Sequence, residues 1–116
     1  MKRASNTVLT FAGWVLDLES RQLKTAAGER MGLTEAEYRI LVLLAQHPRQ
    51  TVARDQLLMA AAGREPSPLD RSLDVHIGNL RRKLDTDPKQ PSLIRTVRGS
   101  GYMLVPGDTA PPRSPS

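Results

Sequence analysis

The sequence predicts an α+β fold in which a small antiparallel β-sheet precedes three helices and a β-hairpin follows them. Three observations lead to this class. Short β-compatible runs, separated by turn residues, fill residues 7–32. The apolar period then lengthens to the helical one. Residues 94–105 form a strand, a Gly-Ser-Gly turn and a second strand.

Composition narrows the class of protein further. A chain of 116 residues suits one domain, and an apolar fraction of 39% permits a core. Its net charge of +5 suits a polyanionic partner. The absence of cysteine excludes a disulfide framework and a thiolate metal site. No apolar run approaches the ~18 residues that span a bilayer, and no signal-peptide core follows Met1, so we expect a cytoplasmic protein without membrane contact.

The chain divides into one domain with two loose ends. We expect residues 1–6 to be the remnant of a linker and residues 7–106 to form the domain. Residues 107–116 combine Pro, Ser and Gly with almost nothing apolar, which predicts a disordered tail.

The domain opens with strand-like segments. Four short runs, TVLTF, WVLDL, RQLKT and ERMGL, are separated by Ala12-Gly13, Glu19-Ser20 and Ala27-Gly28. Turn residues between β-compatible runs predict a meander of about four antiparallel strands.

Two helices follow. In LTEAEYRILVLLAQHP, Thr34 and Glu37 have the spacing of a capping box, and Pro48 marks the stop. After the short extended piece 51–53, RDQLLMAAAG predicts a second helix that ends at Gly63. Ala53 has no side-chain oxygen with which to cap this helix.

A third helix is expected over residues 69–85. Ser67 can serve as its N-cap, Pro68 as its first helical residue and Asp70 as a carboxylate near its positive end. One narrow apolar stripe recurs at helical spacing and comprises Leu69, Leu73, Ile77, Leu80 and Leu84. Two short connected helices before a basic hairpin favour a winged helix-turn-helix, with the hairpin as its wing.

Several segments resemble one bacterial family. LTEAEYRILVLLAQHP, RDQLL, RSLDVHIGNLRRKL and LIRTVRGSGYML are similar to the effector domain of PhoB/OmpR-type response regulators, and FAGWVLDLESRQL resembles that family's amino-terminal sheet. The resemblance covers roughly residues 8–105 in the family's order. The stretch SPLDRSLDVHIGNLRRKL further resembles the envelope-stress branch typified by CpxR.

This resemblance implies the output domain of a two-component system that binds double-stranded promoter DNA, regulates transcription and contacts RNA polymerase. The family's effector domain normally follows a phosphorylatable receiver domain, for which this chain has no room. We therefore expect an isolated effector domain that is monomeric when free and forms a tandem dimer on DNA.

The solvent face of the third helix carries residues that suit a major groove. At about 100° per residue, Arg71, Val75, Gly78 and Arg82 fall opposite Leu73. Arginine can donate two hydrogen bonds to guanine, and valine can pack on a thymine methyl. Glycine lets the backbone approach the DNA closely.

The flanks of this face differ from each other. Asn79 on one flank can pair with adenine. Asp74 and Arg81 lie on the other flank, where Asp74 can accept from cytosine or orient a neighbouring arginine. The resemblance assigns phosphate contacts to Arg71, His76 and Arg81, and places Asp74, Val75 and Asn79 nearer the bases. Some relatives carry arginines at positions 78 and 79, so their base preferences are not carried over.

The hairpin offers a second DNA contact. Thr96 and Arg98 precede its turn, and the resemblance places this arginine in the minor groove, whose negative potential is strongest where A·T pairs narrow it. Gly99 and Gly101 allow a tight turn. The predicted DNA-binding residues are Arg71, Asp74, Val75, His76, Gly78, Asn79, Arg81, Arg82, Thr96, Arg98 and Gly99.

The loop between the second and third helices contains Arg64 and Glu65, where relatives contact RNA polymerase. The alternative is a plain solvated loop, because Ala62 replaces an aromatic residue common there.

Ordinary structural roles compete with these interpretations. The run from Arg81 to Lys83 can be a solvated helix end that complements the dipole. Gly78 can be a tolerated surface glycine, and His76 an ordinary surface histidine. His47 is the other histidine of the sequence, and two separated histidines predict no metal site. No cofactor is expected. Trp14 and Tyr102 are expected to pack in the core or hairpin.

Two other functions are alternatives to DNA binding. A winged helix can be a protein–protein interaction module without specific DNA binding, but residues 71–82 would then form an apolar patch. An enzyme is not expected, because two separated histidines, no cysteine and no glycine-framed serine offer no nucleophile–base pair.

Overall fold

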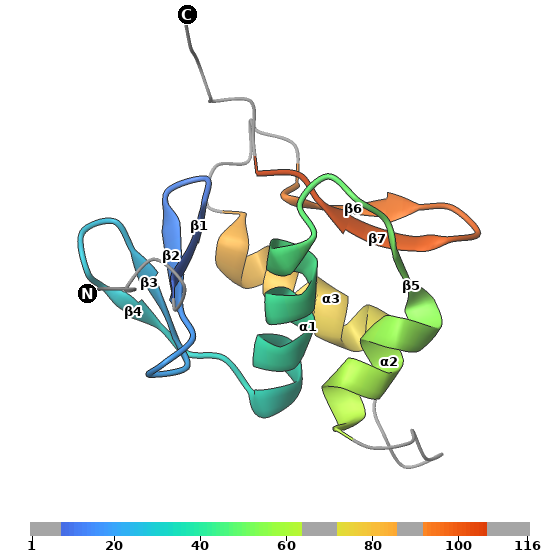
Figure 1. The fold of residues 1–116 in the computed structure, drawn as a ribbon, viewed down its shortest axis with the longest axis horizontal. Coiled ribbons are helices and arrows are strands. Elements are labelled where there is room, and N and C mark those ends of the chain that lie inside the picture. The colour runs from blue at the N-terminus through green and yellow to red at the C-terminus, as the bar shows by residue number, and fades with distance from the viewer. Residues whose placement is uncertain (1–7, 64–71, 86–91, 107–116) are drawn as a thin grey trace, which may run out of the picture.

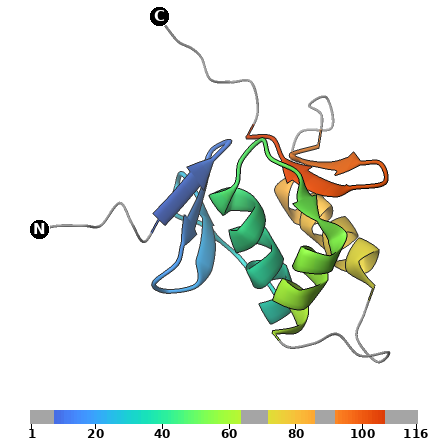
Figure 2. The same cartoon turned by 45° about the vertical axis from the view of Figure 1, so that its right-hand side comes forward.

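The computed structural model describes residues 8–63, 72–85 and 92–106. Within them the chain forms a four-stranded sheet, three helices and a three-stranded sheet, which confirms the predicted α+β winged-helix class. The two sheets lie on opposite sides of the helices (Figures 1 and 2). The predicted linker remnant and tail lie outside the described residues, so the domain limits remain predictions.

Sheet A is the predicted antiparallel meander. Its strands, in spatial and chain order, are β1 (Val8–Phe11), β2 (Trp14–Asp17), β3 (Gln22–Thr25) and β4 (Arg30–Met31). Ala12 and Gly13 connect the first pair with φ values of 48° and 86°, as a two-residue hairpin turn requires. Apolar side chains alternate onto the helix side of the sheet, and the buried ones are Phe11, Trp14, Leu16 and Leu23.

Helix α1 (Glu35–Gln46) begins at the predicted capping box. The Glu37 backbone N–H donates to Thr34 Oγ1 at 3.1 Å, and the Thr34 N–H donates to the Glu37 carboxylate at 3.0 Å. This arrangement pairs two backbone donors that a helix start leaves without partners. The helix ends at Gln46, two residues before Pro48, as the sequence predicts.

Helix α2 (Arg54–Ala62) also confirms its prediction. Ala53 makes no side-chain cap, and Gly63 ends the helix with φ 69° while its N–H donates to the Met59 carbonyl at 3.0 Å. A left-handed residue at this position favours glycine. The extended piece before the helix is strand β5 (Val52–Ala53).

Helix α3 (Leu73–Leu84) begins later than predicted. The prediction of one helix over residues 69–85 was wrong, because Ser72 is extended and its hydroxyl accepts from the Val75 N–H at 3.4 Å. The proposed cap Ser67, first residue Pro68 and carboxylate Asp70 lie outside the described residues. This local cap replaces the backbone bonds that a continuing helix would need. Residues 64–71 lie outside the described residues, so no structure is assigned to Leu69.

A charged pair joins the first turn of α1 to the last turn of α3. Glu37 is 1% exposed and is the buried acidic residue of the described core. Its carboxylate pairs with the Lys83 ammonium, whose side chain is 28% exposed. Because a buried charge is costly without a partner, this pair fixes where the two helices meet.

Sheet B contains the predicted hairpin and one strand that the sequence did not assign to it. Strands β6 (Ile94–Val97) and β7 (Gly101–Leu104) pair antiparallel, and β5 pairs with β7 on its other side. This explains Gly101, because an added Cβ there would lie 2.0 Å from the Val52 carbonyl oxygen. Gly99 adopts φ 77°, as predicted for the turn, whereas Gly101 is required by the close approach of β5.

The core is largely aliphatic, as the few aromatic residues predict. Trp14 and Tyr102 are 6% and 4% exposed, which confirms their packing roles. From the helices the fully buried side chains are Ile40, Leu41, Leu44, Leu57, Leu73, Ile77, Leu80 and Leu84. None of the helices within residues 8–106 that the structure describes is long and apolar enough to cross a membrane.

Candidate nucleic-acid interface

Helix α3 has the two opposed faces that its periodicity predicts. Leu73, Ile77, Leu80 and Leu84 are at most 2% exposed and pack into the core. Val75 is 40% exposed. A single exposed apolar side chain is ordinary on a protein surface, so what matters is that Val75 lies on the face opposite the buried stripe, where it can contact another molecule.

Gly78 lies on the solvent face of α3 and Asn79 on its flank, and both leave this surface open. A Cβ added at Gly78 would meet no atom within 4 Å, so no other part of the described chain requires glycine there. Asn79 accepts a hydrogen bond from the Arg82 guanidinium through Oδ1. This bond uses neither of the two N–H groups of the Asn79 amide. Arg82 is exposed and His76 is half-buried.

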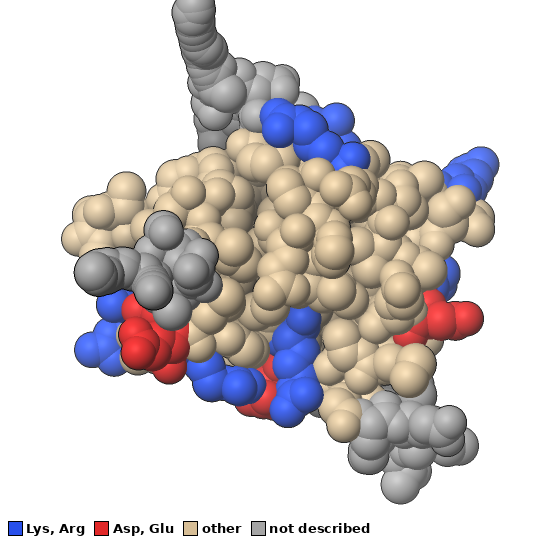
Figure 3. Space-filling view, in the orientation of Figure 1, with Lys and Arg blue, Asp and Glu red and all other residues tan. Residues whose placement is uncertain are grey.

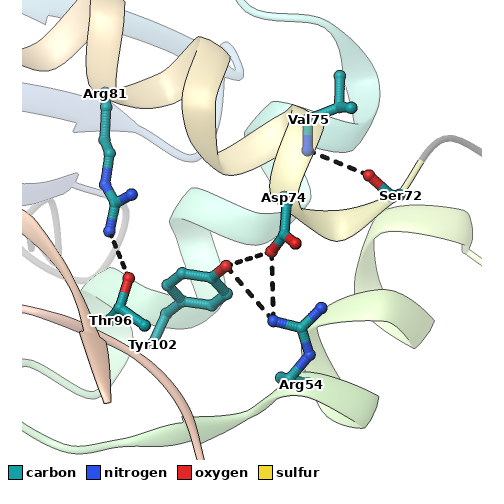
Figure 4. A network of polar contacts seen from close by, with 7 residues as sticks. All are labelled: Arg54, Ser72, Asp74, Val75, Arg81, Thr96 and Tyr102. Atoms are coloured by element: carbon teal, nitrogen blue, oxygen red, sulfur yellow. Dashed lines mark hydrogen bonds and ion pairs between the residues drawn. The ribbon is translucent and has the colours of Figure 1, made fainter. Parts of the chain in front are cut away.

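Asp74, a predicted base contact, is already held within the chain. Its Oδ1 atom accepts from the Tyr102 hydroxyl and from Arg54 Nη1, the latter at 3.2 Å (Figure 4). These two bonds, from Tyr102 first and Arg54 second, hold the pKa of Asp74 below its ordinary value. Burial raises the pKa of Tyr102, and the neighbouring Asp74 raises it further.

Arg81, a predicted phosphate contact, binds the hairpin. Its Nε donates to the Ile94 carbonyl at 2.9 Å, and its Nη2 donates to Thr96 Oγ1 at 3.0 Å. The guanidinium also lies 5.7 Å from the centre of the Tyr102 ring. Two residues that the sequence assigned separately to DNA, Arg81 and Thr96, therefore contact each other (Figure 4).

The hairpin turn is open to solvent. Arg98, Gly99 and Ser100 are all exposed, and the Ser100 N–H donates to the Val97 carbonyl at 2.9 Å. The turn therefore presents the Arg98 guanidinium beyond the body of the domain, as a minor-groove contact requires.

The broad face seen in Figure 3 differs from this surface. Over the upper part of α1 it carries few charged side chains, whereas Lys, Arg, Asp and Glu lie near the lower end of α1 and toward the edges of the face. Helix α3 lies behind α1 in this orientation (Figure 1). The candidate interface therefore consists of the solvent face of α3 and the hairpin turn.

Some predicted residues cannot be placed. Arg71, Arg64 and Glu65 lie outside the described residues. Conversely, no sequence pattern singled out Arg54, which starts α2, or Asp85, which follows α3. Among residues 8–63, 72–85 and 92–106, no three His, Asp or Glu side chains gather as metal ligands would.

Comparison with known proteins gives the class of this fold and surface. The family model described as "Transcriptional regulatory protein, C terminal" matches residues 28–104. The chain belongs to this family, the OmpR/PhoB-type winged-helix effector domains. It is a family of transcription regulators and not of enzymes.

Individual relatives agree with this class. The regulatory protein VirG of Agrobacterium fabrum is 46% identical over 95 residues, which are 82% of this chain but 38% of VirG. VirG of Rhizobium rhizogenes is likewise 46% identical, over 94 residues that make up 39% of that protein. The chain thus spans well under half the length of these curated relatives.

Two solved DNA-binding domains match over nearly their whole length. The DNA-binding domain of Escherichia coli CpxR has a TM-score of 0.72 and 36% identity, covering 84% of this chain and 95% of that domain. The Klebsiella pneumoniae RstA DNA-binding domain, solved with the RstA box, has a TM-score of 0.70 and 36% identity, with coverages of 86% and 98%. The resemblance to the CpxR branch in particular stays a prediction, since RstA is equally similar.

Proposed function

We propose that this domain binds duplex promoter DNA in a sequence-specific manner and thereby regulates transcription, with α3 in the major groove. The observation that carries the proposal is the solvent face of α3, where an exposed Val75 adjoins an open Gly78. Asn79 and Arg82 add hydrogen-bond donors to this face. Such a surface can contact thymine methyl groups and base edges once it enters a groove.

The contacts divide between bases and phosphates. Val75 and Asn79 lie nearest the bases, together with the Asp74 carboxylate oxygen that does not bind Tyr102 and Arg54. Gly78 permits close approach of the helix backbone to the DNA. Arg71, Arg81 and Arg82 supply charge for phosphates and His76 supplies a ring N–H, which gives affinity without sequence preference.

The hairpin is proposed to lie at the adjacent minor groove. Arg98 at its exposed turn enters the groove, and Gly99 keeps the turn narrow beside the sugars. Thr96 lies at the base of the turn. A narrow A·T-rich groove attracts an arginine most strongly, so flanking sequence contributes to affinity.

A protein–protein interaction module is the alternative from another class. It would need an apolar patch on the solvent face of α3. The exposed large apolar residues of the described chain are Val75 and Met59, which lie on different helices, α3 and α2. This favours DNA over a protein partner.

Partners beyond DNA follow from the family resemblance. We propose that the loop with Arg64 and Glu65 contacts RNA polymerase and that a receiver domain belongs to the full-length regulator. The domain is proposed to be cytoplasmic, monomeric when free and a tandem dimer on DNA.

The test begins with selection of bound sites from random duplexes, followed by titration of a selected duplex at two salt concentrations. We expect a steep loss of affinity with salt, because several phosphate contacts release counterions. Asn79→Ala is expected to change the selected sequence, and Lys24→Ala on sheet A serves as the matched control. Salt-insensitive binding, or an unchanged selected sequence for Asn79→Ala, would refute the proposed role of α3.

A further inference from the structure

Helix α3 carries a third face, which neither packs into the core nor faces solvent freely. Asp74, Arg81 and Asp85 are separated by seven and four residues, so they lie within about 40° of one another around the helix. We call these three residues the docking stripe. Asp74 and Arg81 hold sheet B by polar contacts, and Asp85 holds the residues that lead into β6.

The stripe contacts the hairpin at successive points. At the end of α3, Asp85 accepts from the Ser92 hydroxyl at 2.7 Å and from the Leu93 N–H at 3.1 Å. Farther along α3, Arg81 donates to the Ile94 carbonyl and the Thr96 hydroxyl. The contacts therefore proceed along β6 toward the turn.

Asp74 ends the stripe nearest the start of α3. It accepts from the hydroxyl of Tyr102 on β7 and from Arg54 at the start of α2. The Tyr102 ring lies between two guanidinium groups, those of Arg54 and Arg81, each 5.7 Å from its centre (Figure 4). One aromatic ring thus connects α2, α3 and the hairpin.

These contacts matter because β6 is an edge strand. Sheet B has the order β5-β7-β6, so β5 anchors β7 directly and β6 only through β7. Beyond Ile94, whose side chain is fully buried, the strand continues to exposed Arg95 and Thr96. Among the polar contacts of the described residues, the Arg81–Thr96 bond is therefore the one between β6 and α3 that lies nearest the turn with Arg98.

The exposure of these side chains indicates that their contacts mainly orient the hairpin and add little stability. The side chains of Arg54 and Asp74 are 47% and 65% exposed. Ion pairs at such exposure add little to stability. A set of directional bonds between two elements nevertheless limits the angles at which these elements can meet.

We propose that the docking stripe is a positioning device. It holds the hairpin at one angle against α3, so that Arg98 enters the minor groove in register with the bases that α3 contacts. This inference rests on the proposed function and gives Arg81 and Thr96 a positioning role, because they act through Arg98. The two DNA contacts then behave as one unit.

The test compares two duplexes that share a selected core site and differ only in an A·T or G·C flank. The quantity measured is the ratio of the two affinities. A fraction of unfolded protein lowers both affinities equally, so this ratio is insensitive to a loss of stability. We expect Thr96→Val to lower the ratio by about threefold, since a hydrogen bond to a charged group contributes about a factor of ten or more and a pair at an exposed position contributes less.

Conservative variants separate positioning from a direct phosphate contact. Thr96→Ser keeps the hydroxyl and is expected to keep the ratio. Arg81→Lys keeps the charge but replaces the rigid fork of two donating nitrogens by one flexible ammonium nitrogen, so it is expected to lower the ratio. In the Arg81→Ala background, Arg98→Ala is expected to cost little more. Uniform losses on both duplexes, with additive effects of these two substitutions, would overturn the proposal.

A second measurement needs no DNA. The chain has no cysteine, so Gln46→Cys and Ser100→Cys permit selective spin labelling of α1 and the turn. We expect the distance distribution between the labels to broaden with Thr96→Val and to stay narrow with Thr96→Ser. If Thr96→Val leaves the distance distribution unchanged, the positioning role of the docking stripe is overturned. Wild-type protein that binds neither duplex would overturn the proposed function alone, because these distances still test the docking.

Discussion

The two sheets of this domain are attached to the helices by different interactions. Sheet A contributes Phe11, Trp14, Leu16 and Leu23 to the core, and its half-exposed Arg21–Glu35 pair is a minor addition. Sheet B buries Ile94, Tyr102 and Leu104 but also makes the polar contacts of the docking stripe. Apolar contacts are non-directional, whereas hydrogen bonds fix geometry. The comparison suggests that sheet A mainly stabilises the domain and that sheet B is oriented for a task.

The largest expected effect separates stability from binding. Leu23 is fully buried, so Leu23→Ala should lower the free energy of unfolding by about 3 kcal/mol. The flank ratio of the remaining folded protein should not change. Urea unfolding and paired titrations measure both quantities, and Lys24→Ala on the same strand is the control. A changed flank ratio for Leu23→Ala would contradict the division between the sheets.

A smaller loss is expected where β5 meets β7. Gly101→Ala places a methyl group 2.0 Å from the Val52 carbonyl oxygen, so the strands must separate. We expect a cost of about 2 kcal/mol, typical of overpacking, together with weaker binding. The neighbouring exposed Ser100→Ala should leave stability unchanged. If Gly101→Ala unfolds at the wild-type denaturant concentration, the close packing of β5 on β7 is refuted.

A gain in stability, in place of a loss, is expected for a substitution on the open face of α3. Gly78→Ala should raise the free energy of unfolding by up to about 1 kcal/mol, because alanine favours helix and an added Cβ meets nothing within 4 Å. Affinity for DNA should fall if the backbone approaches the groove there. Thermal unfolding and a duplex titration test both signs, and tighter binding would argue against close approach.

The smallest expected effect is the loss of the Asp74 contacts at acidic pH. The pKa of Asp74 is lowered from 3.8, first by Tyr102 and then by Arg54. Because the folded pKa lies below the unfolded one, the ionised carboxylate stabilises docking above pH 3.8, and this contribution disappears as the pH falls through the lower value.

The ring resonances of Tyr102 should report this transition in an NMR titration from about pH 6 to about pH 2. Asp74→Asn should remove the step. A Tyr102 transition that persists in Asp74→Asn would assign it to another group.

The sequence was sufficient for most of the fold. Short β-compatible runs between turn residues predicted sheet A, and the Thr34–Glu37 spacing predicted the start of α1. The start of α3 was missed because Leu69 continues the apolar spacing, while the local cap at Ser72 decides where the helix begins. Strand β5 was not assigned to a sheet because two residues carry no pattern, and only its pairing with Gly101 defines it.

The candidate site was predicted in part. The opposition of Val75 to the buried stripe follows from helical period alone. The docking stripe does not, because Asp74 and Arg81 have the same chemistry whether they contact DNA or a neighbouring strand. Only the approach of β6 and β7 to α3 distinguishes these roles. Arg54 was missed for the same reason, since its partners lie 20 and 48 residues away.

The central claim is that α3 and the hairpin turn together form the DNA-binding surface. Backbone amide shifts recorded while a selected duplex is added test it most directly. We predict large changes in α3 and at residues 98–100, with sheet A unchanged. Changes confined to sheet A or to α2, with α3 unperturbed, would contradict the account.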